Sequence, residues 1–167
     1  MKNDNVLYYV EGKDEEKLIS VFKTEMQLIL PGKVQVFNPV SQIITKSRLM
    51  TLKENTIIIF VFDTDVGDSK ILLKNQEMLM NCSRVKEIYF IPQCKNLEDE
   101  LVRSCKIKKI TELLDSKGNS NFKTDFIKTN NLADKLEKSE FDIKKLWCGK
   151  TSGAFSGIPN DSFRIKK

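Results

Sequence analysis

The stretch NTIIIFVFDTD, residues 55–65, is the most strongly apolar part of the chain. Residues 57–62 are all apolar, as expected for a strand that is buried on both faces inside a parallel sheet. Asp63 and Asp65 follow this strand at once. A single aspartate here would be an ordinary turn or helix-cap residue. Two carboxylates at the end of a buried strand repel one another unless a cation lies between them. We therefore expect a central parallel strand that ends at a candidate cation site.

The segments on either side of this strand alternate between strand-like and helix-like patterns. Strand-like runs occupy residues 5–10, 33–38, 55–62 and 85–91, and helix-like runs occupy residues 14–30, 40–52 and 69–81. This alternation predicts the α/β class, with a mainly parallel four-stranded sheet flanked by helices. Ligand sites in such sheets lie beyond the carboxyl ends of the strands.

The pattern changes after Pro92. Helical spacing is expected at residues 96–116, 122–139 and 141–150, with a loop at 117–121 and an irregular segment at 151–167. We expect two parts: a catalytic core over residues 1–95, and a helical and irregular basic extension over residues 96–167 that packs on the core.

Positive charge is concentrated in the second half of the chain. The net charge is +5, but residues 84–167 hold 18 lysines and arginines against 12 aspartates and glutamates, whereas residues 1–83 hold 10 against 11. A basic segment attracts a polyanion by counterion release, which favours nucleic acid as a partner. A solvated tail has the same composition. The candidate nucleic-acid-binding residues are Lys13, Lys144, Lys145 and Arg164.

Three aromatic residues lie within or beside the basic C-terminal stretch. Trp147, Phe155 and Phe163 are candidates for stacking on bases. Side chains of this type more often serve as core or interface anchors.

Composition excludes several kinds of chemistry. The chain has no histidine, so the usual general base of a catalytic triad is missing. Its four cysteines are far apart and form no C-x-x-C pair, which disfavours zinc and disulfide frameworks. No apolar run approaches the roughly 20 residues that cross a bilayer, and the first residues lack a signal-peptide pattern. We expect a cytoplasmic protein without a membrane partner, whose chemistry depends on carboxylates, lysines and a hard metal ion.

A second acidic motif follows the first strand. The sequence VEGKDE places Glu11 and Gly12 directly after residues 5–10. In a parallel sheet, Glu11 and the Asp63–Asp65 pair fall at the same edge. The alternative is a simple strand-to-helix turn, in which the acidic residues 14–16 form a solvated helix start.

This ordered pair of motifs resembles the Toprim domain. That family includes topoisomerases, bacterial primases, the ribonucleases that mature 5S ribosomal RNA, and the overcoming-lysogenization-defect nucleases. Its pattern is a hydrophobic strand ending in Glu-Gly, followed by further βα units and a hydrophobic strand ending in Asp-x-Asp. YYVEGKDE and IIIFVFDTD match it in order, and the resemblance covers about residues 5–92. It implies a Toprim-like, Rossmann-like fold.

The resemblance also implies roles for particular residues. Glu11 would be a metal ligand or general acid/base, and Asp63 and Asp65 would hold Mg²⁺ or Mn²⁺. Glu15, four places after Glu11, would serve a second metal, and Gly12 fits a tight turn with close backbone approach.

Four further residues, Asp68, Glu98, Lys150 and Lys13, complete the candidate site. Family members often continue Asp-x-Asp-x-Asp-Gly or Asp-x-Asp-x-x-Gly, whereas here Gly67 precedes Asp68, so the third carboxylate is shifted. Glu98, just past the fourth strand, stands where nuclease-like members often carry another acid. Lys150 and Lys13 are the candidate catalytic lysines.

The leading functional expectation is a small Mg²⁺- or Mn²⁺-dependent nuclease. Because many nuclease members of the family work in phage-defence systems, the resemblance also implies a role as an effector in phage defence. The tyrosines lie in expected strands, which disfavours topoisomerase chemistry. One alternative is a non-catalytic or partner-dependent Toprim subunit of an ATPase complex. The ATPase would be a separate chain, because CGKTSG in this sequence is not a phosphate-binding loop. A second alternative is a haloacid-dehalogenase-like phosphatase. The first motif of that family is a strand followed by Asp-x-Asp-x-Thr/Val, and FDTDV satisfies it.

Overall fold

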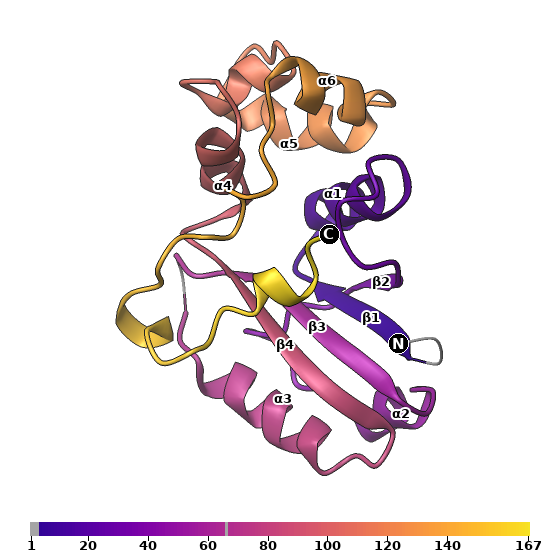
Figure 1. Ribbon diagram of the computed structural model, residues 1–167. Coiled ribbons are helices and arrows are strands. Elements are labelled where there is room, and N and C mark those ends of the chain that lie inside the picture. The colour runs from indigo at the N-terminus through magenta and orange to yellow at the C-terminus, as the bar shows by residue number, and fades with distance from the viewer. Residues whose placement is uncertain (1–3, 66) are drawn as a thin grey trace.

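A single parallel sheet forms the centre of the molecule (Figure 1). The computed structural model describes residues 4–65 and 67–167. Its strand order is β2-β1-β3-β4, and every neighbouring pair is parallel. The strands are β1 (Asn5–Val10), β2 (Lys33–Val36), β3 (Thr56–Asp63) and β4 (Val85–Gln93). The α/β class with a four-stranded parallel sheet flanked by helices is thereby confirmed.

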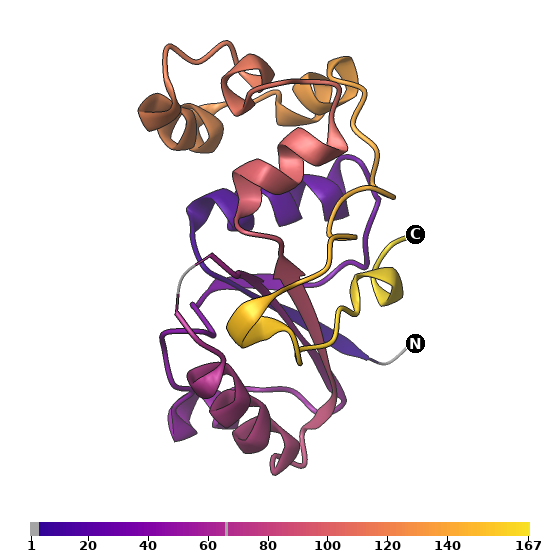
Figure 2. The ribbon, with the colours of Figure 1, turned by 90° about the vertical axis from the view of Figure 1, so that its left-hand side faces the viewer.

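Helices cover both faces of this sheet. In Figures 1 and 2, α1 and the group α4 to α6 lie on one side, and α2 and α3 lie on the other. The helices are α1 (Lys13–Thr24), α2 (Lys46–Met50), α3 (Lys70–Met80), α4 (Leu97–Ser104), α5 (Asn119–Lys128) and α6 (Leu132–Lys138), with 3-10 turns η1 (Ile110–Leu113), η2 (Gly153–Phe155) and η3 (Ser162–Arg164). Within the described residues, none of the helices has the length and apolar character needed to span a membrane.

Strand β3 is buried along its length because both of its faces meet a hydrophobic cluster. Ile57, Ile59 and Val61 belong to the cluster under α1 and α4, whereas Ile58 and Phe60 belong to the cluster under α3. Successive side chains of a strand point to opposite faces, so an uninterrupted apolar run can supply both clusters.

Helix α1 is shorter than expected, and the prediction of a helix to residue 30 is wrong. It ends at Thr24, and Gln27 has a φ of 53°. Ile29 then forms an antiparallel bridge with Lys166, and the Leu30 N–H donates to the Ile165 carbonyl at 2.9 Å. Pairing with a segment remote in sequence satisfies backbone groups that a longer helix would have satisfied locally.

The expected helix over residues 40–52 is also wrong for its first half, since α2 begins only at Lys46. The preceding loop is held by Asn75 of α3, which is fully buried. Its side chain accepts a hydrogen bond from the Ile44 N–H at 2.8 Å and donates to the carbonyls of Pro39 and Gln42 at 2.9 and 2.8 Å. These contacts replace the helical bonds of residues 40–45.

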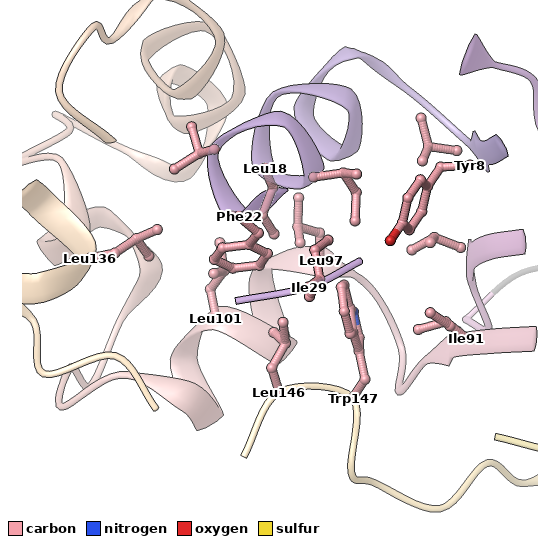
Figure 3. Close-up of a cluster of buried hydrophobic side chains, with 14 of the residues drawn as sticks. Tyr8, Leu18, Phe22, Ile29, Ile91, Leu97, Leu101, Leu136, Leu146 and Trp147 are labelled. Carbon is pink, nitrogen blue, oxygen red and sulfur yellow. The ribbon is translucent and has the colours of Figure 1, made fainter. Parts of the chain in front are cut away.

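Residues 141–150, expected to be helical, form no helix in this structure. They instead carry Trp147 into the cluster under α1, among side chains such as Phe22 and Leu101 (Figure 3). Trp147 has a φ of 55°, which is rare for a bulky side chain. Hydrogen bonds hold this conformation: the Trp147 N–H donates to Glu100, and its carbonyl accepts from Asn160 and Ser162.

Glu100 of α4 joins three parts of the chain. Its carboxylate is fully buried and accepts hydrogen bonds from the N–H of Cys94 at 2.7 Å and of Trp147 at 2.9 Å. Arg103 lies 2.8 Å away and compensates the charge. The end of β4, helix α4 and the C-terminal segment therefore depend on one side chain.

We predict that Glu100→Gln destabilises the protein by about 1–3 kcal/mol, since an amide cannot accept both backbone N–H groups on equal terms and leaves a buried donor unsatisfied. Chemical denaturation measures this change, with the exposed Glu137→Gln as matched control. An equal stability of both variants would contradict the assigned role of Glu100.

Candidate functional site

Glu11 and Asp63 meet at the carboxyl edge of the sheet. Glu11 directly follows Val10 of β1, and Asp63 ends β3 two residues after Val61, the partner of Val10. The Asp63 N–H donates to Glu11 Oε1 at 3.1 Å. The parallel register thus brings the Glu11 carboxylate to the backbone of Asp63, 52 positions later in the sequence, where the charge of Glu11 also acts on the Asp63 carboxyl group.

Asp65 lies at the same edge but is exposed. The loop that carries it is fastened to the loop after β4, because the N–H groups of Thr64 and Asp65 both donate to the Lys95 carbonyl, at 2.9 and 3.2 Å. The Asn96 side-chain amide donates to Asp65 Oδ2 at 3.3 Å. Asp65 is therefore positioned from outside its own loop.

The first turn of α1 adds two buried carboxylates. Asp14 is 7% exposed and Glu15 is 3% exposed, so the acidic helix start is not the solvated one of the simpler interpretation. Glu15 Oε2 accepts a hydrogen bond from the Gly12 N–H at 2.9 Å. A Cβ at Gly12 would lie 2.8 Å from Asp14 Oδ1, so glycine permits the close approach of these carboxylates.

Gln93, the last residue of β4, is a site residue that the sequence did not reveal. Its side chain is fully buried, and Nε2 donates to Asp63 Oδ1 at 2.6 Å. Glu15 Oε1 lies 3.5 Å from the same nitrogen. An amide that ends an apolar strand, separated by two residues from the acidic NLEDEL segment that begins at Asn96, is the signal that the sequence offers for it.

Trp147 sets the orientation of the Gln93 amide. The indole Nε1–H donates to Gln93 Oε1 at 3.4 Å. Because an indole N–H can only donate, the atom that faces it must be the amide oxygen. The amide nitrogen is thereby directed toward Asp63.

Burial and mutual repulsion raise the pKa values of three carboxyl groups in this cluster. Burial, followed by the charge of Glu11, raises the pKa of Asp63 to about 8, although the Gln93 hydrogen bond opposes the shift. Burial, followed by the charge of Asp14, raises the pKa of Glu15 to about 9. Burial also raises the pKa of Glu11, and the charges of Asp65 and Asp14 add to this effect.

Lys123 of α5 is the cation nearest these acids on the helical side. Its Nζ lies 3.5 Å from Asp14 Oδ2 and 3.6 Å from Glu98 Oε1. Glu98 is thus drawn toward the cluster from α4. The charge of Glu98 also contributes to the raised pKa of Asp63.

The donor set fits a hard divalent cation. Glu11, Asp63 and Asp65 present carboxylate oxygens from two neighbouring strand ends, and oxygen ligands are those that Mg²⁺ and Mn²⁺ prefer. Across residues 4–65 and 67–167, however, no group of three or more histidine, cysteine, aspartate or glutamate side chains is arranged to hold a metal ion. The carboxylates of Asp63 and Asp65 accept hydrogen bonds from the side chains of Gln93 and Asn96, one oxygen of each being used in this way.

The other candidate ligand, Asp68, is placed at the start of α3. Its carboxylate accepts a hydrogen bond from the Lys70 N–H at 2.9 Å, and its side chain is half exposed. This is the arrangement of a helix-capping residue. The structure does not bring Asp68 to the carboxylate cluster.

The candidate basic residues are dispersed. The Lys150 carbonyl accepts from Cys94 Sγ at 3.3 Å, which places its backbone beside the end of β4. Lys13 pairs with Glu16 at 2.7 Å. Lys144 and Lys145 are exposed in the segment before Trp147.

Arg164 lies near the opposite end of β4. It pairs with Glu87 at 2.8 Å and stacks over Tyr89. Of the aromatic candidates for base stacking, Trp147 and Phe155 are buried in the core, and Phe163 is 71% exposed.

The raised pKa values predict a stability that falls as pH rises. The folded protein keeps protons on Asp63 and Glu15 up to about pH 8 and 9, whereas the unfolded chain releases them near its ordinary values of 3.8 and 4.5. The stabilisation by proton binding is thus fully present below those ordinary values and lost as pH rises through the folded values. Without divalent cations, we expect the Tm to fall by at least about 3 °C between pH 6 and pH 9, which corresponds to about 1 kcal/mol for a chain of this size.

The variant Asp63→Asn tests the origin of this effect. It should flatten the pH dependence and raise the Tm at pH 9, because it removes one of the repelling charges. Differential scanning fluorimetry at both pH values, with Asp134→Asn on α6 as control, measures the change. A wild-type Tm that rises from pH 6 to pH 9 would refute the assignment.

Gln93→Leu should change the pH dependence of the Tm in the opposite direction to Asp63→Asn. Its amide donates to Asp63 and lowers the pKa of that group, so leucine in its place leaves the buried carboxylate with less stabilisation when charged. We expect a steeper fall in Tm from pH 6 to pH 9 than in the wild type. The same slope as the wild type would show that the amide does not act on Asp63.

No protein-family profile, curated protein or solved structure matches this chain. The candidate site is therefore defined by its own geometry.

Proposed function

We propose that the chain is a Mg²⁺- or Mn²⁺-dependent nuclease of Toprim type, which hydrolyses phosphodiester bonds in DNA or RNA. The observation that carries this proposal is the contact of Glu11 with Asp63 across two parallel strands, with Asp65 held at the same edge. The buried acids of α1 surround this pair, and no histidine or thiolate is among them. Such a donor set suits a hard cation and a phosphate substrate.

Glu11, Asp63 and Asp65 would hold the ion, which when bound neutralises charge on the phosphate and makes its water more acidic. Gln93 keeps the Asp63 carboxylate in place, and Asn96 does the same for Asp65. Glu11 is partly buried beside other acids, and burial raises its pKa above the ordinary value of a glutamate, which is the direction that a general acid requires.

Glu15 and Glu98 are the residues that would serve a second ion. Glu15 is close to Gln93, and Glu98 is linked to Asp14 through Lys123. Lys150 is the candidate catalytic lysine, because its backbone is held beside the end of β4. A bound cation would also offset the repulsion among these acids.

A partner-dependent Toprim subunit of an ATPase complex is the second candidate. It is favoured by the exposed apolar side chains of Met50, Met80 and Phe163, which are 74%, 71% and 71% exposed. Contiguous exposed apolar patches mark association surfaces, so these three side chains are where such a patch would form. A phosphatase of the haloacid-dehalogenase type has less support, because its mechanism gives no role to Glu11, which contacts Asp63 in this structure.

The decisive experiment is cleavage of labelled single-stranded RNA, tRNA and plasmid DNA by the purified chain with Mg²⁺ or Mn²⁺. We expect cleavage that Glu11→Gln and Asp63→Asn reduce by about 10²- to 10⁴-fold, the range for loss of a catalytic acid or base. Glu137→Gln and Asp134→Asn, which make the same chemical changes on exposed α6, should cleave like the wild type. A folded, metal-binding wild type that cuts none of these polymers would refute the autonomous nuclease and favour the partner-dependent subunit.

A further inference from the structure

A cavity of about 730 Å³ opens between the first turn of α4, the residues around η1 and the start of α5. Its walls differ in charge. Asn96, Glu98 and Asp99 line the α4 side, where Lys123 and Lys95 lie 3.6 and 3.7 Å from the two carboxylates, and Lys108, Lys109 and Lys117 line the opposite side.

The α4 side of this cavity is shared with the carboxylate cluster. Asn96 donates to Asp65 Oδ2 at 3.3 Å, and Glu98 is bridged by Lys123 to Asp14. A molecule in the cavity would therefore lie directly beside the candidate metal ligands.

The lysines on the other wall are available for an external anion. Lys108, Lys109 and Lys117 are exposed, and among the described residues no carboxylate oxygen lies within 4 Å of their ammonium groups. Two neighbouring lysines differ in this respect: Lys106 pairs with Glu140 at 2.6 Å, and Lys95 pairs with Asp99 at 3.7 Å.

The basic wall is held in a fixed conformation. The Glu112 carboxylate accepts the N–H groups of Lys108 and Lys109 at 3.4 and 3.2 Å. Ile110 and Leu113 of η1 are buried in the core and anchor the same segment. The lysine backbones therefore start from a defined position.

The start of α5 adds a favourable backbone field. Gly118 and Asn119 line the cavity, and α5 begins at Asn119. The unpaired N–H groups and positive dipole end of a helix N-terminus favour an anion there. Together with three lysines, this makes a phosphate the best-suited ligand.

We propose that this cavity binds the sugar-phosphate backbone of a nucleic acid strand. Phosphates of the strand lie against Lys108, Lys109 and Lys117, and the adjoining phosphodiester lies at Glu11 and Asp63. The inference rests on the proposed nuclease function and identifies the substrate as a strand that extends from the cluster across α4 and α5. The shared chemistry is the phosphodiester backbone, which both RNA and DNA present.

The basic wall is a different surface from the basic C-terminal stretch. Arg164 is paired with Glu87 near the opposite end of β4, and Lys144 and Lys145 belong to the segment that leads to Trp147. Lys108, Lys109 and Lys117 line one cavity together with Asn96 and Glu98, which contact the carboxylate cluster.

Fluorescence anisotropy with labelled 12-nucleotide single-stranded RNA and DNA, in EDTA and from 50 to 200 mM KCl, tests this surface. The triple variant Lys108→Gln, Lys109→Gln, Lys117→Gln should bind at least about 10-fold more weakly, and its log–log salt slope should fall by about 2, since each phosphate contact on a single strand contributes about 0.7. The RNA and DNA arms show which polymer is preferred.

The matched control is Lys46→Gln, Lys53→Gln, Lys74→Gln, which removes the same charge from exposed positions on and near α2 and α3. It should keep wild-type affinity. The inference would be overturned if both triple variants lost the same affinity, if the Lys108, Lys109 and Lys117 variant lost none, or if the wild type did not bind. Loss confined to Lys144→Gln, Lys145→Gln, Lys150→Gln would overturn it in favour of the C-terminal stretch. Thermal unfolding confirms that each variant is folded.

Binding in EDTA separates this inference from the proposed function. Cavity-dependent binding without metal-dependent cleavage would support the surface and refute the autonomous nuclease. Cleavage that the cavity triple retains at wild-type KM would refute the surface and leave the nuclease standing.

Discussion

Parallel pairing of β3 with β1 on one side and β4 on the other is the constraint on which the rest of the structure depends. All three strands end at one edge of the sheet, so the parallel pairing alone brings the residues at their carboxyl ends close together. Glu11, Asp63 and Gln93 meet for this reason. The burial that stabilises β3 also raises the free energy of the charges at its end, so the core and the site are coupled.

Gln93 links that edge to the rest of the molecule. Its amide contacts Asp63 on one side and the Trp147 indole on the other, and Trp147 is held by Glu100. A buried polar chain of this kind is stable only when every member has its partner. Residues from β3, β4, α4 and the C-terminal segment are thereby fixed relative to one another.

Local pattern was sufficient to predict the sheet but insufficient for contacts between distant segments. The apolar run of β3 and the acidic motifs after β1 and β3 predicted the α/β class and the meeting of Glu11 with Asp63. The early end of α1 depends on pairing with Ile165, and the late start of α2 depends on Asn75, neither of which a local window contains. Gln93 and Lys123 were missed because an amide in a strand and a lysine on a helix are ordinary until their neighbours are known.

The late position of Trp147 in the chain has a consequence for the order in which the site is assembled. A ribosome synthesises β1, β3 and β4 well before residue 147, so the strands that lead to the acids of the site have been made while the indole that orients Gln93 has not. The indole orients the Gln93 amide only after the C-terminal segment has docked. The sheet is therefore encoded earlier in the chain than the residue that completes the site.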